Sequence, residues 1–161
     1  MNFTIRKLNS KDWQKYKYIR LQTLLTEPQA FSSKHSDFAN RKKDYWINLL
    51  DSKNKFYFLA ESENTPIGIV SVDLKDEDEA PETAVIGGLY VEKAYRKNKI
   101  GALLIDSVIN HVKVLDNVKK LRLYVIQNQI AAIHLYKKLG FEPAGEKDGE
   151  LIMDKSTNIS N

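Results

Sequence analysis

Residues 89–104, which read LYVEKAYRKNKIGALL, decide the fold. The apolar run that ends at Val91 is typical of a β-strand, and the apolar spacing that begins at Ile100 is typical of a helix. Between them lies a polar loop, residues 92–99, with four cations near the helix start: Lys93, Arg96, Lys97 and Lys99. A helix start has N–H groups without partners in the helix, and Gly101 would let a ligand approach them, so the segment suits a pyrophosphate. An ordinary basic loop explains the same pattern, and the segment alone favours that simpler interpretation.

Strands and helices follow one another on both sides of this segment. Apolar runs predict strands over residues 4–8, 56–60, 67–72, 83–91, 121–126, 141–146 and 150–154. Apolar residues at three- and four-residue intervals predict helices from a Ser10 cap to Leu25 and over residues 36–50, 100–115 and 130–139. Paired glycines at positions 87 and 88 predict a bulge in the strand before the loop. This order predicts an α/β domain with a mixed sheet covered by helices.

The composition is that of one ordinary domain, which we expect over residues 1–155, followed by a short polar tail over residues 156–161. The 161 residues include no cysteine, which excludes disulfides, thiolate metal sites and a cysteine nucleophile, and fits a cytoplasmic location. No segment reaches the length of a membrane span. The net charge of +4 comes from scattered basic residues without interleaved aromatic residues. Neither a membrane nor a nucleic acid is therefore expected as a partner.

Two motifs resemble those of one enzyme family. Residues 96–102, RKNKIGA, are similar to the pyrophosphate-binding signature of the GCN5-related N-acetyltransferase (GNAT) superfamily, which is Arg or Gln, two residues, Gly, one residue, then Gly or Ala. Residues 128–141, NQIAAIHLYKKLGF, resemble its second motif, and residues 20–31 loosely resemble the first helices of its small bacterial members. Two motifs in the right order are far more specific than either alone.

The chain departs from the signature at two lysines. Lys99 replaces the first signature glycine, and Lys97 occupies another position that is often glycine. If the backbone at residue 99 were left-handed, a lysine there would be strained. The added positive charges would nevertheless favour an anionic ligand.

The resemblance implies a fold and a reaction. The implied fold is a mostly antiparallel, twisted sheet of about seven strands, flanked by four helices and splayed between strands four and five. The implied reaction is transfer of the acetyl group of acetyl-CoA to a primary amine of a small molecule or peptide, without a metal. A homodimer is retained as one candidate assembly. The alternative function is a non-catalytic domain that binds acyl-CoA for sensing.

The resemblance also assigns cofactor-binding roles. It implies that main-chain groups of Leu89, Tyr90 and Val91 hold the pantetheine arm and polarise the thioester carbonyl. The implied pyrophosphate site is the loop and helix start: Arg96, Lys97, Asn98, Lys99, Ile100, Gly101 and Ala102. Asn128 would contact the cofactor where two strands part, and it could also cap the next helix.

Tyr136 is the side chain that the resemblance places in catalysis. It would contact the cofactor and give a proton to the departing thiolate, while a buried core tyrosine is the competing account. The general base is not assigned, because Glu92 and the acidic residues between positions 73 and 82 are mostly expected to be solvated charges. As a hypothesis, that acidic stretch attracts a cationic amine. The histidines at positions 35, 111 and 134 lack metal-ligand spacing.

Overall fold

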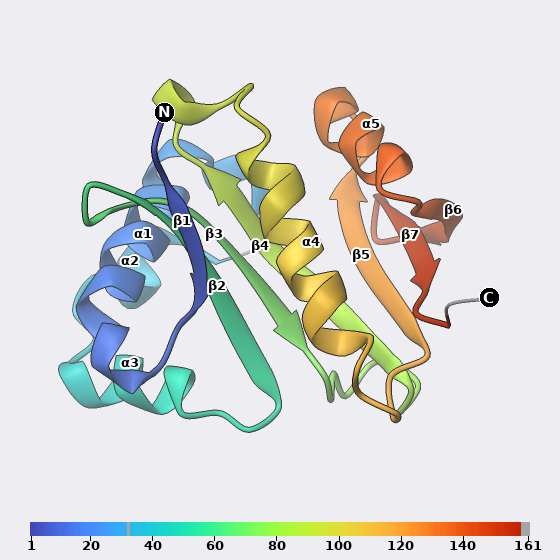
Figure 1. Ribbon diagram of the computed structural model, residues 1–161, viewed down its shortest axis with the longest axis horizontal. Helices are drawn as coiled ribbons and strands as arrows, with labels where there is room; N and C mark the ends of the chain where they lie inside the picture. The colour runs from blue at the N-terminus through green and yellow to red at the C-terminus, as the bar shows by residue number, and fades with distance from the viewer. Residues whose placement is uncertain (32, 159–161) are drawn as a thin grey trace.

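A computed structural model describes residues 1–31 and 33–158. Within this part of the chain, a seven-stranded sheet has the strand order β1-β2-β3-β4-β5-β7-β6 (Figure 1). The strands are β1 (Thr4–Lys7), β2 (Lys55–Ser62), β3 (Thr65–Asp73), β4 (Thr83–Val91), β5 (Lys120–Ile126), β6 (Glu142–Lys147) and β7 (Glu150–Ser156). Neighbouring strands are antiparallel except β4 and β5, which are parallel. The predicted α/β class and mostly antiparallel sheet are confirmed.

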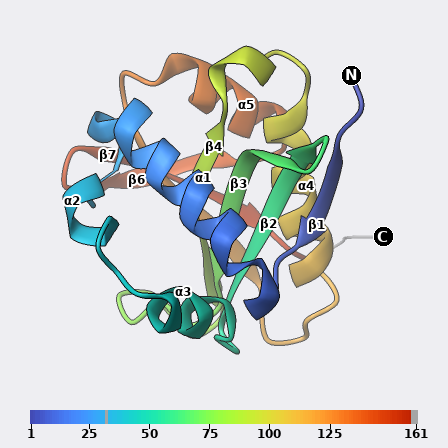
Figure 2. The same ribbon diagram turned by 90° about the vertical axis from the view of Figure 1, so that its left-hand side faces the viewer.

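Helices cover both faces of the sheet. They are α1 (Trp13–Thr26), α2 (His35–Phe38), α3 (Lys43–Leu50), α4 (Ile100–Val112) and α5 (Ile130–Lys138), with short 3-10 turns η1 (Ser10–Asp12), η2 (Pro28–Ala30) and η3 (Lys93–Tyr95). Helices α4 and α5 lie on one face, and α1 to α3 lie on the other (Figures 1 and 2). Two apolar layers are therefore available to stabilise one sheet.

Each face has its own apolar core. Under α4 and α5, Leu104 and Phe141 are at most 1% exposed. Under α1 and α3, Trp46 is fully buried against Tyr16, with the ring centres 5.7 Å apart. Because both faces are covered, the central strands β2 and β3 are buried almost continuously instead of alternating between buried and exposed residues.

The sheet splits between β4 and β5. These strands pair only through Thr83–Val85 and Lys120–Arg122, and they separate beyond those residues. The predicted splay between strands four and five is therefore present. The bulge predicted at Gly87 and Gly88 is also present, because the register of β3 against β4 shifts opposite them. Gly88 has φ = 62°, a left-handed conformation that glycine adopts without strain.

The start of the first helical segment differs by one residue from the prediction. Asn9, and not Ser10, caps it, since the Asn9 side chain accepts a hydrogen bond from the Lys11 N–H (2.9 Å). The Asp12 side chain in turn accepts a hydrogen bond from the Asn9 N–H (2.9 Å), which completes a capping box. Ser10 is the first residue of η1.

Residues 36–50 were expected to form one helix, and the structure divides them between α2 and α3. In a continuous helix, Phe38 and Tyr45 would lie about 10 Å apart along the axis. The break brings their ring centres to 6.1 Å. The Trp46 indole N–H donates to the Arg41 carbonyl within the break (3.2 Å), so aromatic packing and this hydrogen bond replace the missing helical turn.

The last strand, β7, ends at Ser156. Ser156, expected to begin the polar tail over residues 156–161, is the last residue of β7, and residues 159–161 lie outside the described residues. None of the helices in the described part of the chain is long and apolar enough to cross a membrane.

Candidate functional site

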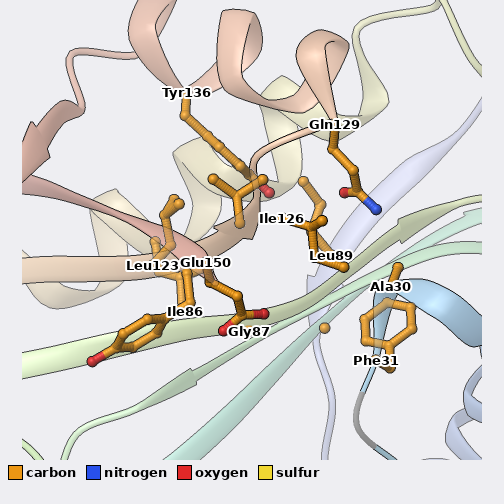
Figure 3. A pocket seen from close by; sticks show the side chains of 13 residues that line it. Ala30, Phe31, Ile86, Gly87, Leu89, Leu123, Ile126, Gln129, Tyr136 and Glu150 are labelled. Atoms are coloured by element: carbon orange, nitrogen blue, oxygen red, sulfur yellow. The ribbon is translucent and has the colours of Figure 1, made fainter. Parts of the chain in front are cut away.

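A cleft lies where β4 and β5 part (Figure 3). Residues 86–89 of β4 form one wall and residues 123–126 of β5 form the other. The remaining lining residues come from three further parts of the chain: Ala30, Phe31, Gln129, Tyr136 and Glu150. A concave site with apolar walls and a few convergent polar groups is the usual form of a small-molecule site.

The main chain of β4 faces the cleft at alternate residues. The Glu92 N–H donates to the Ile67 carbonyl of β3 (2.9 Å). Because alternate residues of an antiparallel strand bond to the same neighbour, Tyr90 also turns its main chain toward β3. Leu89 and Val91 turn theirs toward the parted edge. Of the three residues expected to hold the pantetheine arm, these two therefore have main-chain groups on the open side.

Arg96 ties the loop to α1. Its Nε donates to the Val91 carbonyl (2.8 Å), and its Nη2 donates to Oε1 of Glu27, the residue that ends α1 (2.6 Å). Its guanidinium carbon lies 5.9 Å from the ring centre of Tyr90. The arginine of the signature is thus bound to two groups within the chain, and its contact with the pyrophosphate stays a prediction.

The start of α4, with the loop before it, forms the α4 entrance (residues 96–102). The first helical hydrogen bond runs from the Leu103 N–H to the Lys99 carbonyl (3.0 Å), so the N–H groups of Ile100, Gly101 and Ala102 precede it. Lys99, the N-cap residue, makes no capping hydrogen bond through its side chain. N–H groups without helical partners and the positive end of a helix dipole suit an anion, and the pyrophosphate site at this place stays a prediction.

Two lysines at the entrance have left-handed backbones. The φ angles are 65° at Lys97 and 63° at Lys99, a region that costs an L-residue roughly 1–2 kcal/mol. The backbone at residue 99 thus has the shape that suits the signature glycine, and the strain expected for lysine is present. Asn98 fixes the turn, since its Nδ2 donates to the carbonyls of Tyr95 (3.0 Å) and Arg96 (3.1 Å). Both lysines are exposed, so the turn places two cations beside the helix start.

The residue that faces the cleft at the start of α5 is Gln129. The predicted contact, Asn128, is exposed and is not among the residues that line the cleft. Asn128 also does not cap the helix, because Gln129 is the N-cap residue and makes no capping hydrogen bond through its side chain. The sequence pattern could not distinguish which of these two residues lines the cleft, and the cofactor contact of Asn128 stays a prediction.

Tyr136 is both a core residue and a cleft residue. It is 8% exposed, and its ring centre lies 6.1 Å from that of Phe141. Its hydroxyl points into the cleft (Figure 3). Burial raises the pKa of the phenol to about 12, so the hydroxyl keeps its proton at neutral pH. A core position and a role as proton donor, the two alternatives that the sequence left open for Tyr136, are therefore compatible in the structure.

A polar network supports the β5 wall. Arg122 donates to both carboxylate oxygens of Asp154 (2.8 and 2.9 Å) and to Glu79 (2.9 Å), while the cleft residue Tyr124 donates its hydroxyl to Glu79. Burial raises the pKa of Asp154, but the hydrogen bonds and charge of Arg122 outweigh it and hold that pKa below its usual value. Glu79, expected to be a solvated charge, is therefore part of the wall.

Sequence reasoning missed Phe31, Gln129 and Glu150. Glu150 is placed by its pairing with Ile126 of β5, and no local pattern distinguishes it from the other glutamates of the chain. Phe31 follows η2 and reaches the cleft through the tertiary fold. Among the described residues, no three histidine, aspartate or glutamate side chains gather as a metal ion would require.

Comparison with known sequences identifies the family. A sequence model of the acetyltransferase (GNAT) family matches residues 17–141. The probable spermine N(1)-acetyltransferase of Bacillus subtilis subsp. natto (strain BEST195) is 32% identical over 82 residues, which are 50% of this chain and 54% of that protein. The spermine/spermidine N(1)-acetyltransferase of Bacillus subtilis (strain 168) is 30% identical over the same shares. The chain thus spans about half the length of the curated relatives that it matches.

Solved structures agree with the fold. An acetyltransferase of the GNAT family from Streptococcus pneumoniae has a TM-score of 0.79 at 22% identity, covering 96% of this chain and 99% of its own. The PaiA N-acetyltransferase from Thermoplasma acidophilum, solved with coenzyme A, has a TM-score of 0.76 at 21% identity, covering 97% and 99%. With a family match over most of its length and this fold, the chain belongs to the acetyltransferase (GNAT) family.

Proposed function

We propose that the chain is an N-acetyltransferase that transfers the acetyl group of acetyl-CoA to a primary amine. The main support is a continuous path along the parted strands. A Cβ at Gly101 would lie 3.9 Å from Val91, so the α4 entrance adjoins the open edge of β4. That edge continues to Leu89, which lines the cleft into which Tyr136 points its hydroxyl.

The residues along this path fit acetyl-CoA, which would supply the acetyl group as a thioester. The N–H groups at the start of α4, with the exposed Lys97 and Lys99 beside them, suit a diphosphate. The open edge of β4 suits a pantetheine arm, whose amides can pair with the main chain of Leu89 and with the Val91 N–H as an added strand would.

Two groups in the cleft suit the chemistry of the transfer. A main-chain N–H on the parted edge of β4 can donate to the carbonyl oxygen as negative charge develops on it. The Tyr136 hydroxyl, with its pKa raised to about 12 by burial, is protonated at neutral pH and can donate its proton to the departing sulfur. A sensing domain would need no proton donor at this place, and the direction of the Tyr136 hydroxyl therefore favours catalysis.

The acceptor that we propose is a small cationic primary amine. Two curated relatives are named for spermine or spermidine, which are small molecules with several cationic amines. Matches over half of the chain support the chemical class of the acceptor and not its identity.

Purified protein incubated with acetyl-CoA and a panel of amines tests the function. The panel includes spermidine, simple monoamines and a peptide with a free N-terminus, and free thiol and acetylated product are both measured. We expect thiol release that depends on the amine and an equal amount of acetylated product. Calorimetric binding of CoA without turnover of any amine would favour the sensing domain, and absence of both would refute either function.

A further inference from the structure

Glu150 is a carboxylate that neither the family motifs nor the proposed mechanism uses. It is the first residue of β7 and lies opposite Ile126 of β5 and Lys147 of β6. The side chains of Leu151 and Met153, one and three residues further along β7, pack into the core under α4 and α5. Successive side chains of a strand point to opposite faces, so Glu150 belongs to the other face. Figure 3 shows its carboxylate in the cleft, with Tyr136 above it and Phe31 to one side.

Glu150 differs from the other carboxylates near the cleft. Glu79 is bound by Arg122 and Tyr124, and Asp154 is bound by Arg122. Among the described residues, no lysine or arginine forms an ion pair with Glu150. It is also the one acidic or basic residue among the described residues that line the cleft. A half-buried carboxylate in such a position favours a cationic partner.

We propose that Glu150 binds the nitrogen of the acceptor amine and selects amines that lack a carboxylate next to that nitrogen. This inference rests on the proposed acetyl transfer. The acceptor would bind as an ammonium that donates charge-assisted hydrogen bonds to the Glu150 carboxylate, and it would lose one proton to solvent before the nitrogen lone pair attacks the thioester carbonyl. The Phe31 ring would contact the apolar part of the acceptor. A second carboxylate beside the nitrogen would approach Glu150 with like charge and would be rejected. The acceptor would lie between β7 and the Tyr136 hydroxyl.

The test compares Glu150→Gln with the wild-type enzyme on two acceptors, phenylethylamine and phenylalanine. They differ only in the carboxylate beside the amine. For the wild type we expect kcat/KM to be at least about tenfold higher with phenylethylamine, since a charged hydrogen bond is worth more than 1.4 kcal/mol. In Glu150→Gln, KM for phenylethylamine should rise about tenfold and the preference between the two acceptors should narrow.

Glu146→Gln on the neighbouring strand β6 is the matched control, because Glu146 is exposed and lies outside the cleft. It should match the wild type in all measurements. The CoA affinity and the melting temperature of Glu150→Gln should also match the wild type. An unchanged amine KM and unchanged preference would overturn the role of Glu150 while leaving acetyl transfer intact. A loss of CoA affinity or of stability equal to the loss of activity would show a structural role instead. A wild-type protein that acetylates no amine would refute the proposed function, and this inference with it.

Discussion

The cations of the α4 entrance are exposed, whereas the arginine beside the β5 wall of the cleft is held in ion pairs. Lys97 and Lys99 at the entrance are exposed, and neither forms an ion pair with a described residue. On the wall, Arg122 is held by Asp154 and Glu79, whose side chains are 18% and 6% exposed. Exposed cations remain available to an anionic ligand, whereas paired ones maintain the shape of the wall. The entrance should therefore tolerate the loss of one charge, and the wall should not.

Tyr136 lines the cleft, and its substitution should have the largest effect. Tyr136→Phe keeps the ring in the core and removes the proton donor. We expect turnover to fall at least about 100-fold, with the CoA dissociation constant nearly unchanged. Because the pKa of Tyr136 is raised to about 12, the wild type should lose no activity through this group until the pH approaches that value. Steady-state rates across pH measure this, with the exposed Tyr18→Phe as a control. Full turnover of Tyr136→Phe at every pH would contradict the assignment.

Substitution of Arg122 tests the wall. Arg122→Gln removes the main cation that binds the carboxylates of Glu79 and Asp154 and leaves only Lys120, 3.6 Å from Asp154. This change should lower the free energy of unfolding by about 2 kcal/mol at neutral pH. Urea unfolding monitored by circular dichroism measures this. The double variant Arg122→Gln, Asp154→Asn should recover part of the loss. A change within about 0.5 kcal/mol would show that the network contributes no more than an ordinary surface pair.

The same network predicts a direction for the pH dependence of stability. The pKa of Asp154 in the folded protein lies below its usual value, so the unfolded state binds a proton first as the pH falls. Its contribution is complete above the usual aspartate range and is lost as the pH falls through the folded-state pKa. In Arg122→Gln this acid-side loss should be smaller, because the main cation that lowers the pKa of Asp154 is absent and only Lys120 remains.

At the entrance, Gly101→Asp should separate ligand binding from stability. An acidic residue in the first turn favours the helix, so the melting temperature should not fall. The same charge would face the diphosphate, and the CoA dissociation constant should rise about tenfold. Gly101→Ala is the steric control, because its Cβ would lie 3.4 Å from Leu135, at the edge of ordinary contact. Equal CoA binding by the alanine and aspartate variants would contradict the proposed diphosphate position.

Lys99→Gly should have the smallest effect, and in the opposite direction on stability. Glycine relieves the left-handed strain but loses more backbone entropy on folding, which leaves a gain of about 0.5–1 kcal/mol. For a chain of this size the melting temperature should rise by about 1–4 °C. Loss of one exposed cation should weaken CoA binding only a few-fold. Lys93→Gly, in η3, is the control that should destabilise the protein, and a fall in melting temperature for Lys99→Gly would argue against strain.

The entrance could be predicted because it is local. Strand, loop and helix are consecutive between residues 83 and 112, so their periodicity and the glycines at 87, 88 and 101 were sufficient to locate them. The succession of strands and helices along the chain likewise followed from the pattern, since each strand is short and bounded by turn residues, whereas the pairing order of the strands in the sheet did not.

The cleft walls could not be predicted because they depend on distant pairing. Arg122 meets Glu79 across 43 positions and Asp154 across 32, and periodicity contains no such information. For the same reason, the sequence did not predict that Glu150 lines the cleft. The bond of Arg96 to Glu27, 69 positions away, could not be predicted from the motif either. Local chemistry is thus readable from sequence, and the partners of charged side chains are not.

Because β4 and β5 pair over only three residues each, the rest of the β4 edge is open, which has a consequence for amide exchange with deuterium. Leu89 and Val91 turn their N–H groups to the parted edge, while those of Tyr90 and Glu92 are directed at β3. Neighbouring amides of one strand should therefore exchange at alternating rates, fast at 89 and 91 and slow at 90 and 92. A pantetheine arm bound along this edge would slow only the fast pair, so the strand contains its own internal reference for occupancy.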